Sequence, residues 1–358
     1  MLKDNFCVIG LGQAGCKMAK EFYNNGYRSF FINTSYQDLQ ALNVKNDFVY
    51  HIPSAYGCAK IRSRAIEYAK DYYEQMIGKL LDTHPTARIF LIHYSLGGGT
   101  GGGIANIFTG LLYGTLRSKN IEDFKIINIC ARPKKYESYQ IQKNSIDSLE
   151  EMYNMVDKGI LDQYFIINND SREDLNSINE ENALLFDRWI EGEESNNQSN
   201  TDESERIDLF SYKGNAMIFE FSSKDIEEFK SNIINEYSNS IYCTASKIPT
   251  AIGLALSVNI SEKEAIDIIE NTVGYYSNSH ITPTESSNII FVSGIEDKGS
   301  IKNYITKLAN EKANKINSTE YDNNDEIIEE VQIDTNKHKT KESKKQQVSI
   351  DDILNFYR

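Results

Sequence analysis

The chain has 358 residues, enough for two domains that each bury a core of their own. An apolar fraction of 40% and a charged fraction of 25% are typical of a soluble globular protein that carries some additional polar sequence. The net charge of −14 disfavours nucleic acid as a partner of most of the surface, and no apolar run approaches the ~18–20 residues of a membrane span. We therefore expect a cytoplasmic protein with no direct membrane contact.

The cysteines argue against a disulfide scaffold. They are odd in number and scattered, without a C-x-x-C pair, at Cys7, Cys16, Cys58, Cys130 and Cys243. This pattern is typical of free thiols in a reducing compartment, so we expect neither disulfides nor a zinc site.

The N-terminal apolar run, residues 5–10, predicts a buried strand, and a helix is expected at residues 16–23. Between them lies the turn Gly10-Leu11-Gly12-Gln13-Ala14-Gly15, a G-x-G-x-x-G pattern that occurs in dinucleotide-binding folds. A Rossmann oxidoreductase would place an acidic residue ~20 positions further on, at the end of the second strand. The second expected strand, residues 29–32, ends instead in Asn33-Thr34-Ser35, which counts against NAD as the ligand.

Strands and helices alternate through the first half of the chain. Further strands are expected at residues 47–52, 88–94, 124–130 and 164–167, and helices at 64–81, 104–117 and 138–157. This rhythm predicts an α/β fold with a parallel, doubly wound, Rossmann-like sheet. In such a sheet ligands bind at the carboxyl ends of the strands.

A glycine-rich stretch follows the strand at residues 88–94 and opens the helix at 104–117. It reads Gly97-Gly98-Gly99-Thr100-Gly101-Gly102-Gly103, with six glycines in seven positions. Successive backbone N–H groups and the positive end of the helix can converge there on a phosphate, and the Thr100 hydroxyl can add a contact to a phosphate oxygen or a metal ion. A flexible linker is the alternative, but linkers do not join a buried strand to an amphipathic helix.

The second half of the chain is less regular. Helical spacing returns from about Asn182, and residues 192–206 are almost wholly Glu, Asp, Ser and Asn, the composition of a solvated loop. A smaller α+β domain is expected after it, where Ser261 and Glu264 have the spacing of a capping box. Its expected elements are strands or apolar runs at 216–221, 250–258 and 288–293, and helices at 224–237, 261–272 and 302–315. It contains no catalytic pattern.

The C-terminal residues, 317–358, have the composition of a disordered tail. Residues 318–334 hold seven acidic and no basic side chains, and residues 336–347 hold five lysines against one glutamate. The last segment, residues 348–358, places Ile350, Ile353, Leu354 and Tyr357 at helical spacing. We expect a terminal docking peptide there, for a partner or for the parent subunit, and an ordinary last helix is the alternative.

The glycine stretch resembles the G-G-G-T-G-[ST]-G signature of the tubulin/FtsZ family of polymerising GTPases. Gly102 stands where the signature has Ser or Thr, so one phosphate-side hydroxyl is absent. No P-loop G-K-[ST] competes with this signature, and the first glycine turn fits the same family. The resemblance covers residues 3–315 and implies GTP/GDP and Mg²⁺ as cofactors. The domains it implies are a GTPase domain at 1–180, a long central helix with a catalytic loop at 181–210, an activation domain at 211–316 and the tail at 317–358.

The resemblance also implies a set of nucleotide contacts. These are Gly12, Gln13, Ala14, Gly15, Asn33, Gly97, Gly98, Gly99, Thr100, Gly101, Gly102, Gly103, Pro133, Glu137, Asn169, Ile178 and Asn182. In the family pattern Glu137 would meet the ribose and Asn169 the guanine, while Ile178 and Asn182 would stack on the base and bond to it. No direct protein ligand of the metal is implied, because Mg²⁺ would be held through the phosphates with Gln13 nearby.

In this family a loop after the central helix carries two acidic residues three positions apart and reaches the nucleotide of the neighbouring subunit. Glu205 and Asp208 have that spacing, and Asp202 and Glu203 are alternatives in the same acidic loop. A helix from Asn182 to Glu205 would run about 35 Å at ~1.5 Å per residue, enough to cross a domain. The resemblance therefore implies a head-to-tail filament in which hydrolysis needs the next subunit.

The signature, the tail and residues 54–57 depart from division-type FtsZ and from tubulin. These departures resemble the TubZ-type branch, which plasmids and phages use to move DNA. They imply a filament that pulls DNA through a DNA-binding adaptor on the C-terminal tail, whose lysines are the one expected place of direct nucleic-acid contact. An FtsZ-like division GTPase is the alternative within the family. A dinucleotide-dependent oxidoreductase is the alternative from another class, disfavoured because the acid after the second strand is missing and the five histidines are scattered.

Overall fold

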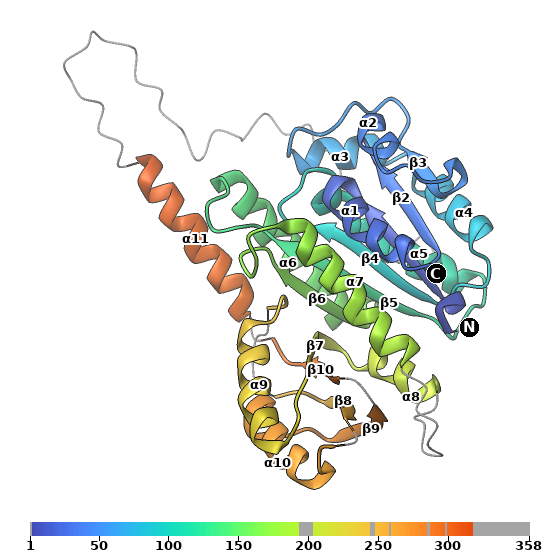
Figure 1. Cartoon of the computed structure of the whole chain (residues 1–358). Coiled ribbons are helices and arrows are strands. Elements are labelled where there is room, and N and C mark those ends of the chain that lie inside the picture. The colour runs from blue at the N-terminus through green and yellow to red at the C-terminus, as the bar shows by residue number, and fades with distance from the viewer. Residues whose placement is uncertain are drawn as a thin grey trace, which may run out of the picture.

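The computed structural model describes residues 2–192, 203–243, 248–257, 259–284, 287–297 and 299–317 (Figure 1). Residues 318–358, on which most of the expected tail and its docking peptide fall, lie outside the described residues. So does Asp202 in the acidic loop. The described chain is built on one sheet with helices on both faces.

Six parallel strands form the first part of the sheet, in the order β3-β2-β1-β4-β5-β6. They are β1 (Phe6–Leu11), β2 (Ser29–Asn33), β3 (Val49–His51), β4 (Ile89–Ser95), β5 (Lys125–Arg132) and β6 (Gln163–Asn168). Every residue of β1 and β2 is buried, as expected for strands covered by helices on both faces. The expected Rossmann-like parallel sheet is confirmed.

Alternating side chains of the strands divide the interior into two cores. Phe6 and Val8 of β1 belong to one core, and Cys7 and Ile9 belong to the other, because successive side chains of a strand point to opposite faces. The first core is covered by α1 (Gly12–Asn24) and α7 (Leu175–Glu191). The second is covered by α3 (Arg62–Ala69), α4 (Tyr73–Thr83), α5 (Thr100–Ser118) and α6 (Tyr139–Asp157).

The helices of the first half differ from the sequence prediction in three places. The helix expected at 64–81 is two helices, because α3 ends at Ala69 and α4 begins at Tyr73. The central helix α7 begins at Leu175, well before the expected start near Asn182, because the Asp174 carboxylate caps it by accepting hydrogen bonds from the backbone N–H groups of Asn176 and Ser177. A short helix, α2 (Tyr36–Gln40), was not expected.

The sheet continues into the second half of the chain through a short parallel ladder. Only Gln163↔Gly214 and Tyr164↔Asn215 pair β6 with β7 (Gly214–Phe221). Beyond β7 the order is β10 (Asn288–Ile295), β8 (Ala251–Ser257) and β9 (Asn278–Thr284), with β10 antiparallel to both of its neighbours.

Three helices of the second half lie where the sequence predicts them: α9 (Ile226–Asn239), α10 (Glu262–Val273) and α11 (Ser300–Asn317). The expected single helix from Asn182 to Glu205 is wrong, because α7 ends at Glu191 and a separate short helix, α8 (Glu203–Asp208), carries Glu205. The expected capping box of α10 is not formed, because Ser261 is the N-cap residue but its side chain makes no capping hydrogen bond. The last of them, α11, packs against α6 of the first half. Among the described helices, none combines the length and the apolar sequence needed to cross a bilayer.

Candidate functional site

A cavity of about 350 Å³ opens at the carboxyl ends of β1, β2 and β4. Its lining comes from the first glycine turn, the end of β2, the glycine stretch before α5 and a segment between β3 and α3. The lining residues are Leu11, Gly12, Gln13, Ala14, Asn33, Thr34, Ser35, Asp38, Gly57, Cys58, Ala59, Lys60, Ser95, Gly98, Gly99, Thr100 and Gly101. The structure thus brings together Gln13, Asn33 and the start of the glycine stretch, which the sequence placed in one site.

Other predicted glycines lie behind this cavity and pack its wall against neighbouring elements. A Cβ atom at Gly15 would overlap the carbonyl oxygen of His93, and one at Gly97 would overlap the Ile141 side chain. One at Gly103 would lie 2.8 Å from the carbonyl oxygen of Arg62. Gly15 thus allows α1 to approach β4 closely, and Gly97 and Gly103 allow the glycine stretch to approach α6 and the start of α3.

Three side chains meet at the bottom of the cavity. The Thr100 and Thr34 hydroxyl oxygens lie 2.8 Å apart, and the Cys58 thiol lies 3.3 Å from the Thr34 hydroxyl and 3.5 Å from that of Thr100. Of these three side chains, only that of Thr100 was among the predicted nucleotide contacts. Thr34 directly follows the predicted contact Asn33, whereas Cys58 carries no pattern of its own and is placed beside the glycine stretch only by the approach of the segment after β3.

Asp38 is a further cavity residue that the sequence did not indicate. Its carboxylate accepts hydrogen bonds from the side-chain amides of Gln13, at 3.4 Å, and Asn33, at 3.2 Å. It stands on α2, five residues beyond the end of β2, so the site does contain an acidic residue near the second strand. The absence of an acid at the strand end is therefore a weaker argument against a dinucleotide than the sequence alone indicated.

The predicted ribose and guanine contacts lie along the same edge of the sheet, after β5 and β6, but do not line the cavity. Glu137 accepts a hydrogen bond from the backbone N–H of Lys134, 2.8 Å away, so it folds back on the loop that starts at Pro133. Asn169 is half-buried and precedes Asp170, which forms a 3.0 Å ion pair with Arg132.

The two predicted base contacts on α7, Ile178 and Asn182, are fully buried. Asn182 accepts a 2.6 Å hydrogen bond from the Tyr242 hydroxyl, inside the core. The same helix presents Asn176 and Asn179 to a neighbouring cavity of about 310 Å³ between α1 and α7. This second cavity shares Gln13 and Asp38 with the glycine-lined one, so the two form adjoining spaces.

Both predicted catalytic carboxylates lie on α8, at the end of α7 that is remote from α2 and the glycine-lined cavity (Figure 1). Glu205 is exposed. Asp208 accepts hydrogen bonds from Ser211 and Tyr212, at 3.4 and 3.3 Å, and lies 3.8 Å from His280 Nε2. Within one chain, therefore, these carboxylates and the cavity are not brought together.

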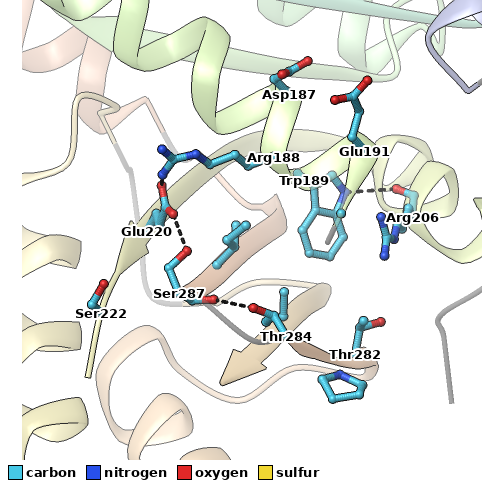
Figure 2. A pocket seen from close by; sticks show the side chains of 14 residues that line it. Asp187, Arg188, Trp189, Glu191, Arg206, Glu220, Ser222, Thr282, Thr284 and Ser287 are labelled. Carbon is cyan, nitrogen blue, oxygen red and sulfur yellow. Dashed lines mark hydrogen bonds and ion pairs between the residues drawn. The ribbon is translucent and has the colours of Figure 1, made fainter. Parts of the chain in front are cut away.

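A larger cavity, about 490 Å³, lies between the C-terminal part of α7 and strands β7 to β10 (Figure 2). Two of its charged groups pair with each other, Arg188 with Glu220, which also accepts a hydrogen bond from Ser287. Two others, Asp187 and Glu191, pair with Lys3. It has no glycine turn at the carboxyl end of a strand and no helix N-terminus lined by successive glycines, so it offers no phosphate cradle. In the described ranges, no group of three or more His, Cys, Asp or Glu side chains could hold a metal ion.

Residues 5–177 match the protein-family model of the Tubulin/FtsZ family, GTPase domain. This stretch is therefore a GTPase domain of that family. The chain is also 25% identical to the tubulin-like protein TubZ of Clostridium botulinum C phage, over 98% of this chain and 96% of the relative.

Solved structures agree on the fold. The tail-truncated TubZ of Clostridium botulinum phage c-st is superposed with a TM-score of 0.78 at 24% identity, covering 88% of this chain and 100% of the other. A GTPγS-form protofilament of TubZ from Bacillus thuringiensis serovar israelensis gives a TM-score of 0.70 at 18% identity, with coverage of 87% and 93%.

Proposed function

We propose that this protein is a GTP-dependent, filament-forming GTPase that segregates phage or plasmid DNA. The observation that carries this proposal is the separation of the glycine-lined cavity from the carboxylates of α8, which lie at opposite ends of the region that α7 spans. Such an arrangement becomes a complete site when subunits stack head to tail. Similarity to TubZ over nearly the whole chain supports this function in preference to a division GTPase or an oxidoreductase.

The phosphates of GTP would lie on the glycine-lined wall. The helices α1 and α5 both begin there, so unpaired N–H groups and two positive helix ends face the cavity. The adjoining cavity between α1 and α7 would take the base, with Asn176 and Asn179 as its polar contacts in place of the buried Ile178 and Asn182. Glu137 and Asn169 remain candidates for the ribose and guanine.

The residues of the cavity fit a magnesium ion held jointly with the phosphates. Thr100, Asp38 and Gln13 offer a hydroxyl, a carboxylate and an amide oxygen, the hard oxygen ligands that Mg²⁺ prefers. When bound, the ion would neutralise charge on the phosphate oxygens. The chain's own groups would orient the nucleotide, since Gln13 and Asn33 are already fixed by their hydrogen bonds to Asp38.

Hydrolysis would occur between subunits. A water molecule would attack the γ-phosphorus, the bond to the β,γ-bridging oxygen would break, and GDP and inorganic phosphate would form. Glu205 of the neighbouring subunit would orient that water and accept its proton. Two residues are candidates for the second catalytic carboxylate that acts with Glu205. Asp208 follows Glu205 by three residues and Asp202 precedes it by three, but Asp208 already contacts Tyr212.

Electron microscopy with GTPγS and Mg²⁺ tests the filament most directly, and we expect filaments of stacked subunits. With GTP, light scattering should rise on mixing and decay as the nucleotide is consumed. A protein that binds GTP but stays monomeric at high concentration would contradict the proposal.

We also propose that the C-terminal tail binds a DNA-binding adaptor. Deletion of residues 336–358 should leave assembly intact and abolish co-sedimentation of the filament with the adaptor and its DNA. Replacement of the five lysines in this segment by glutamine tests the contribution of their charge to adaptor binding separately from that of the terminal peptide, residues 348–358. An assembly defect in the deletion would contradict this role, because it would mean that the tail packs on the filament itself.

A further inference from the structure

The segment between β3 and α3 forms one wall of the glycine-lined cavity and carries an unusual turn. Ala59 and Lys60 are consecutive non-glycine residues in the left-handed region, with φ of 47° and 63°. Such a backbone persists only where its surroundings hold it in place. Strained backbone of this kind clusters at ligand sites. This turn therefore points to a role for the side chains that it places at the cavity.

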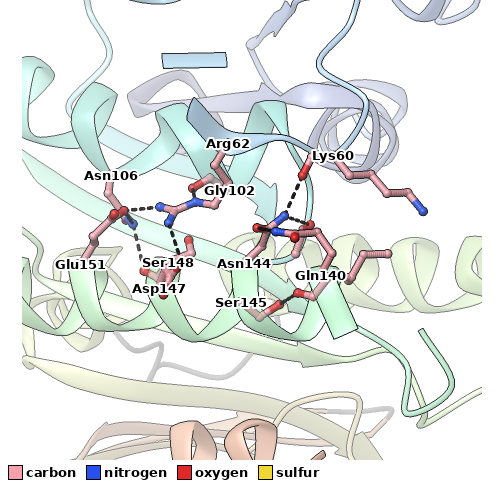
Figure 3. Close-up of polar contacts among 12 residues, drawn as sticks. Lys60, Arg62, Gly102, Asn106, Gln140, Asn144, Ser145, Asp147, Ser148 and Glu151 are labelled. Carbon is pink, nitrogen blue, oxygen red and sulfur yellow. Dashed lines mark hydrogen bonds and ion pairs between the residues drawn. The ribbon is translucent and has the colours of Figure 1, made fainter. Parts of the chain in front are cut away.

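The turn is held in place by hydrogen bonds from α6 (Figure 3). The Asn144 amide donates hydrogen bonds to the carbonyl oxygens of Lys60, at 2.9 Å, and Gly97, at 3.1 Å, and so ties the turn to the glycine stretch. Gln140 donates to the Asn144 oxygen, at 2.8 Å, which fixes the orientation of the amide. A Cβ atom at Gly99 would lie 2.9 Å from the Lys60 Cα, so the two backbones are in close contact.

Arg62 holds the other side of the turn. Its Nε donates to the carbonyl oxygen of Gly102, at 2.7 Å, and its Nη2 lies 2.6 Å from Glu151 Oε2. Asn106 also donates to Glu151, at 3.1 Å, and Asp147 lies 3.7 Å from the guanidinium. The charge of Arg62 is therefore satisfied within the fold, and its role is to position the turn.

Lys60 differs from Arg62 in this respect. Among the described residues that line the glycine-lined cavity, it is the only cationic one, and the one acidic residue, Asp38, is engaged by Gln13 and Asn33. Within the described parts of the chain, the Lys60 ammonium makes no hydrogen bond or ion pair. Figure 3 shows its side chain extending away from Asn144, on an exposed residue.

We propose that Lys60 pairs with the phosphate chain of the bound nucleotide, and that Asn144 and Arg62 are positioning residues that hold it at the cavity. This inference rests on the proposed nucleotide site. Backbone N–H groups and helix ends supply only partial positive charges, about half an elementary charge per helix, whereas a triphosphate carries several full negative charges. The ammonium group of this exposed lining residue adds one full charge and three donors.

Binding of a fluorescent GTP analogue to the full chain tests the proposal. Lys60→Asn removes the charge while keeping a residue that tolerates the left-handed region, and Lys60→Arg keeps the charge. We expect Lys60→Asn to weaken GTP binding about tenfold, to weaken GMP binding less, and to reduce the salt dependence, and we expect Lys60→Arg to restore most of the affinity. Lys119→Asn, an exposed lysine at the far end of α5, is the matched control and should bind like the unmodified chain.

Equal GTP affinity and equal salt dependence of Lys60→Asn and the unmodified chain would overturn the inference. A loss that Lys60→Arg does not restore would overturn it as well, because the turn rather than the charge would then be responsible. Failure of the unmodified chain to bind GTP would instead overturn the proposed function. Circular dichroism of each variant identifies any that fails to fold.

Discussion

Gly102 occupies the position at which the family signature carries a hydroxyl, and the fold leaves no room for a side chain there. A Cβ atom at Gly102 would overlap the carbonyl oxygen of Leu96, and that backbone cannot move without disturbing the end of β4. Gly102 also accepts the hydrogen bond from Arg62. The missing hydroxyl is thus a property of the local packing as well as of the sequence.

We predict that Gly102→Ser lowers the free energy of unfolding by about 1–3 kcal/mol, the usual cost of overpacking, and does not strengthen nucleotide binding. Chemical denaturation monitored by circular dichroism measures the change. Gly98→Ala is the matched control, since its Cβ would lie 3.6 Å or more from its neighbours and should leave stability nearly unchanged. Equal stability of the two variants would contradict this prediction, because it would mean that the Leu96 carbonyl shifts to make room for the serine side chain.

His93 lies in β4, directly behind the first glycine turn, and is fully buried. Burial lowers the pKa of His93 to about 3. In the unfolded chain its pKa is near 6.5, so as pH falls below that value the unfolded state takes up a proton that the folded state does not. This residue therefore makes the fold less stable in acid.

We predict that His93→Leu reduces the loss of stability between pH 7.5 and 5.5 by about 1 kcal/mol. Urea unfolding at the two pH values, compared between the variant and the unmodified chain, measures the difference. The same acid dependence in both proteins would mean that other groups dominate this range.

At the scale of elements, α6 connects the glycine stretch with the turn at Lys60. In the part of the chain that the structure describes, Asn144 is the single side chain that bonds to both, and it is nearly fully buried. Its loss leaves two backbone carbonyls without this partner, and a buried unsatisfied group costs about 1–3 kcal/mol.

We predict that Asn144→Ala destabilises the protein by about this amount and weakens GTP binding, because the wall of the cavity loses its anchor. Denaturation and nucleotide titration measure the two effects. Asn154→Ala, on an exposed position of the same helix, should change neither. Unchanged GTP affinity in Asn144→Ala would show that the turn holds its shape unaided.

The regular elements of the first half could be predicted because hydrophobic periodicity and glycine turns report directly on parallel strands and the helices between them. β9 could not, since its sequence, Asn278–Thr284, is polar and contains a proline, and it lies at the edge of the sheet. The start of α7 was missed because Leu175, the one apolar residue before Ile178, is exposed, and the buried apolar stripe begins only at Ile178.

The candidate site likewise has one part that the sequence predicts and one part that it does not. Its backbone wall follows from local signatures, whereas Thr34, Asp38, Cys58 and Lys60 come from segments that meet only in the folded chain. No spacing along the sequence connects these residues with the glycine stretch. The burial of Asn182 likewise depends on Tyr242, sixty residues further on.

At the scale of the whole molecule, the glycine-lined cavity and the carboxylates of α8, which we propose to form one site between subunits, lie apart within the chain (Figure 1). The glycine-lined cavity lies at the carboxyl edge of the parallel strands, and α8 with Glu205 follows the far end of α7. The 17 residues of α7, which runs between these two regions, span about 25 Å at ~1.5 Å per residue. One chain alone cannot close this distance, but a second copy stacked on the first can.

This arrangement predicts complementation between two inactive variants. Glu205→Ala keeps the cavity but removes the exposed carboxylate of α8, and Gly98→Val fills the cavity but keeps α8 intact. We expect each variant alone to release little phosphate from GTP. An equimolar mixture should recover a substantial part of the activity, because an intact cavity of the first variant then meets an intact α8 of the second.

Phosphate release by the mixture is the measurement, and sedimentation shows whether the two variants co-assemble. Asp208→Ala and Asp202→Ala, each mixed with Gly98→Val in the same way, identify which acid acts with Glu205. Since Asp208 is engaged by Ser211 and Tyr212, we expect its loss to affect turnover less than the loss of Glu205. Co-assembly without recovered activity would contradict a shared site, and high activity of monomeric protein would place the catalytic carboxylate within the same chain.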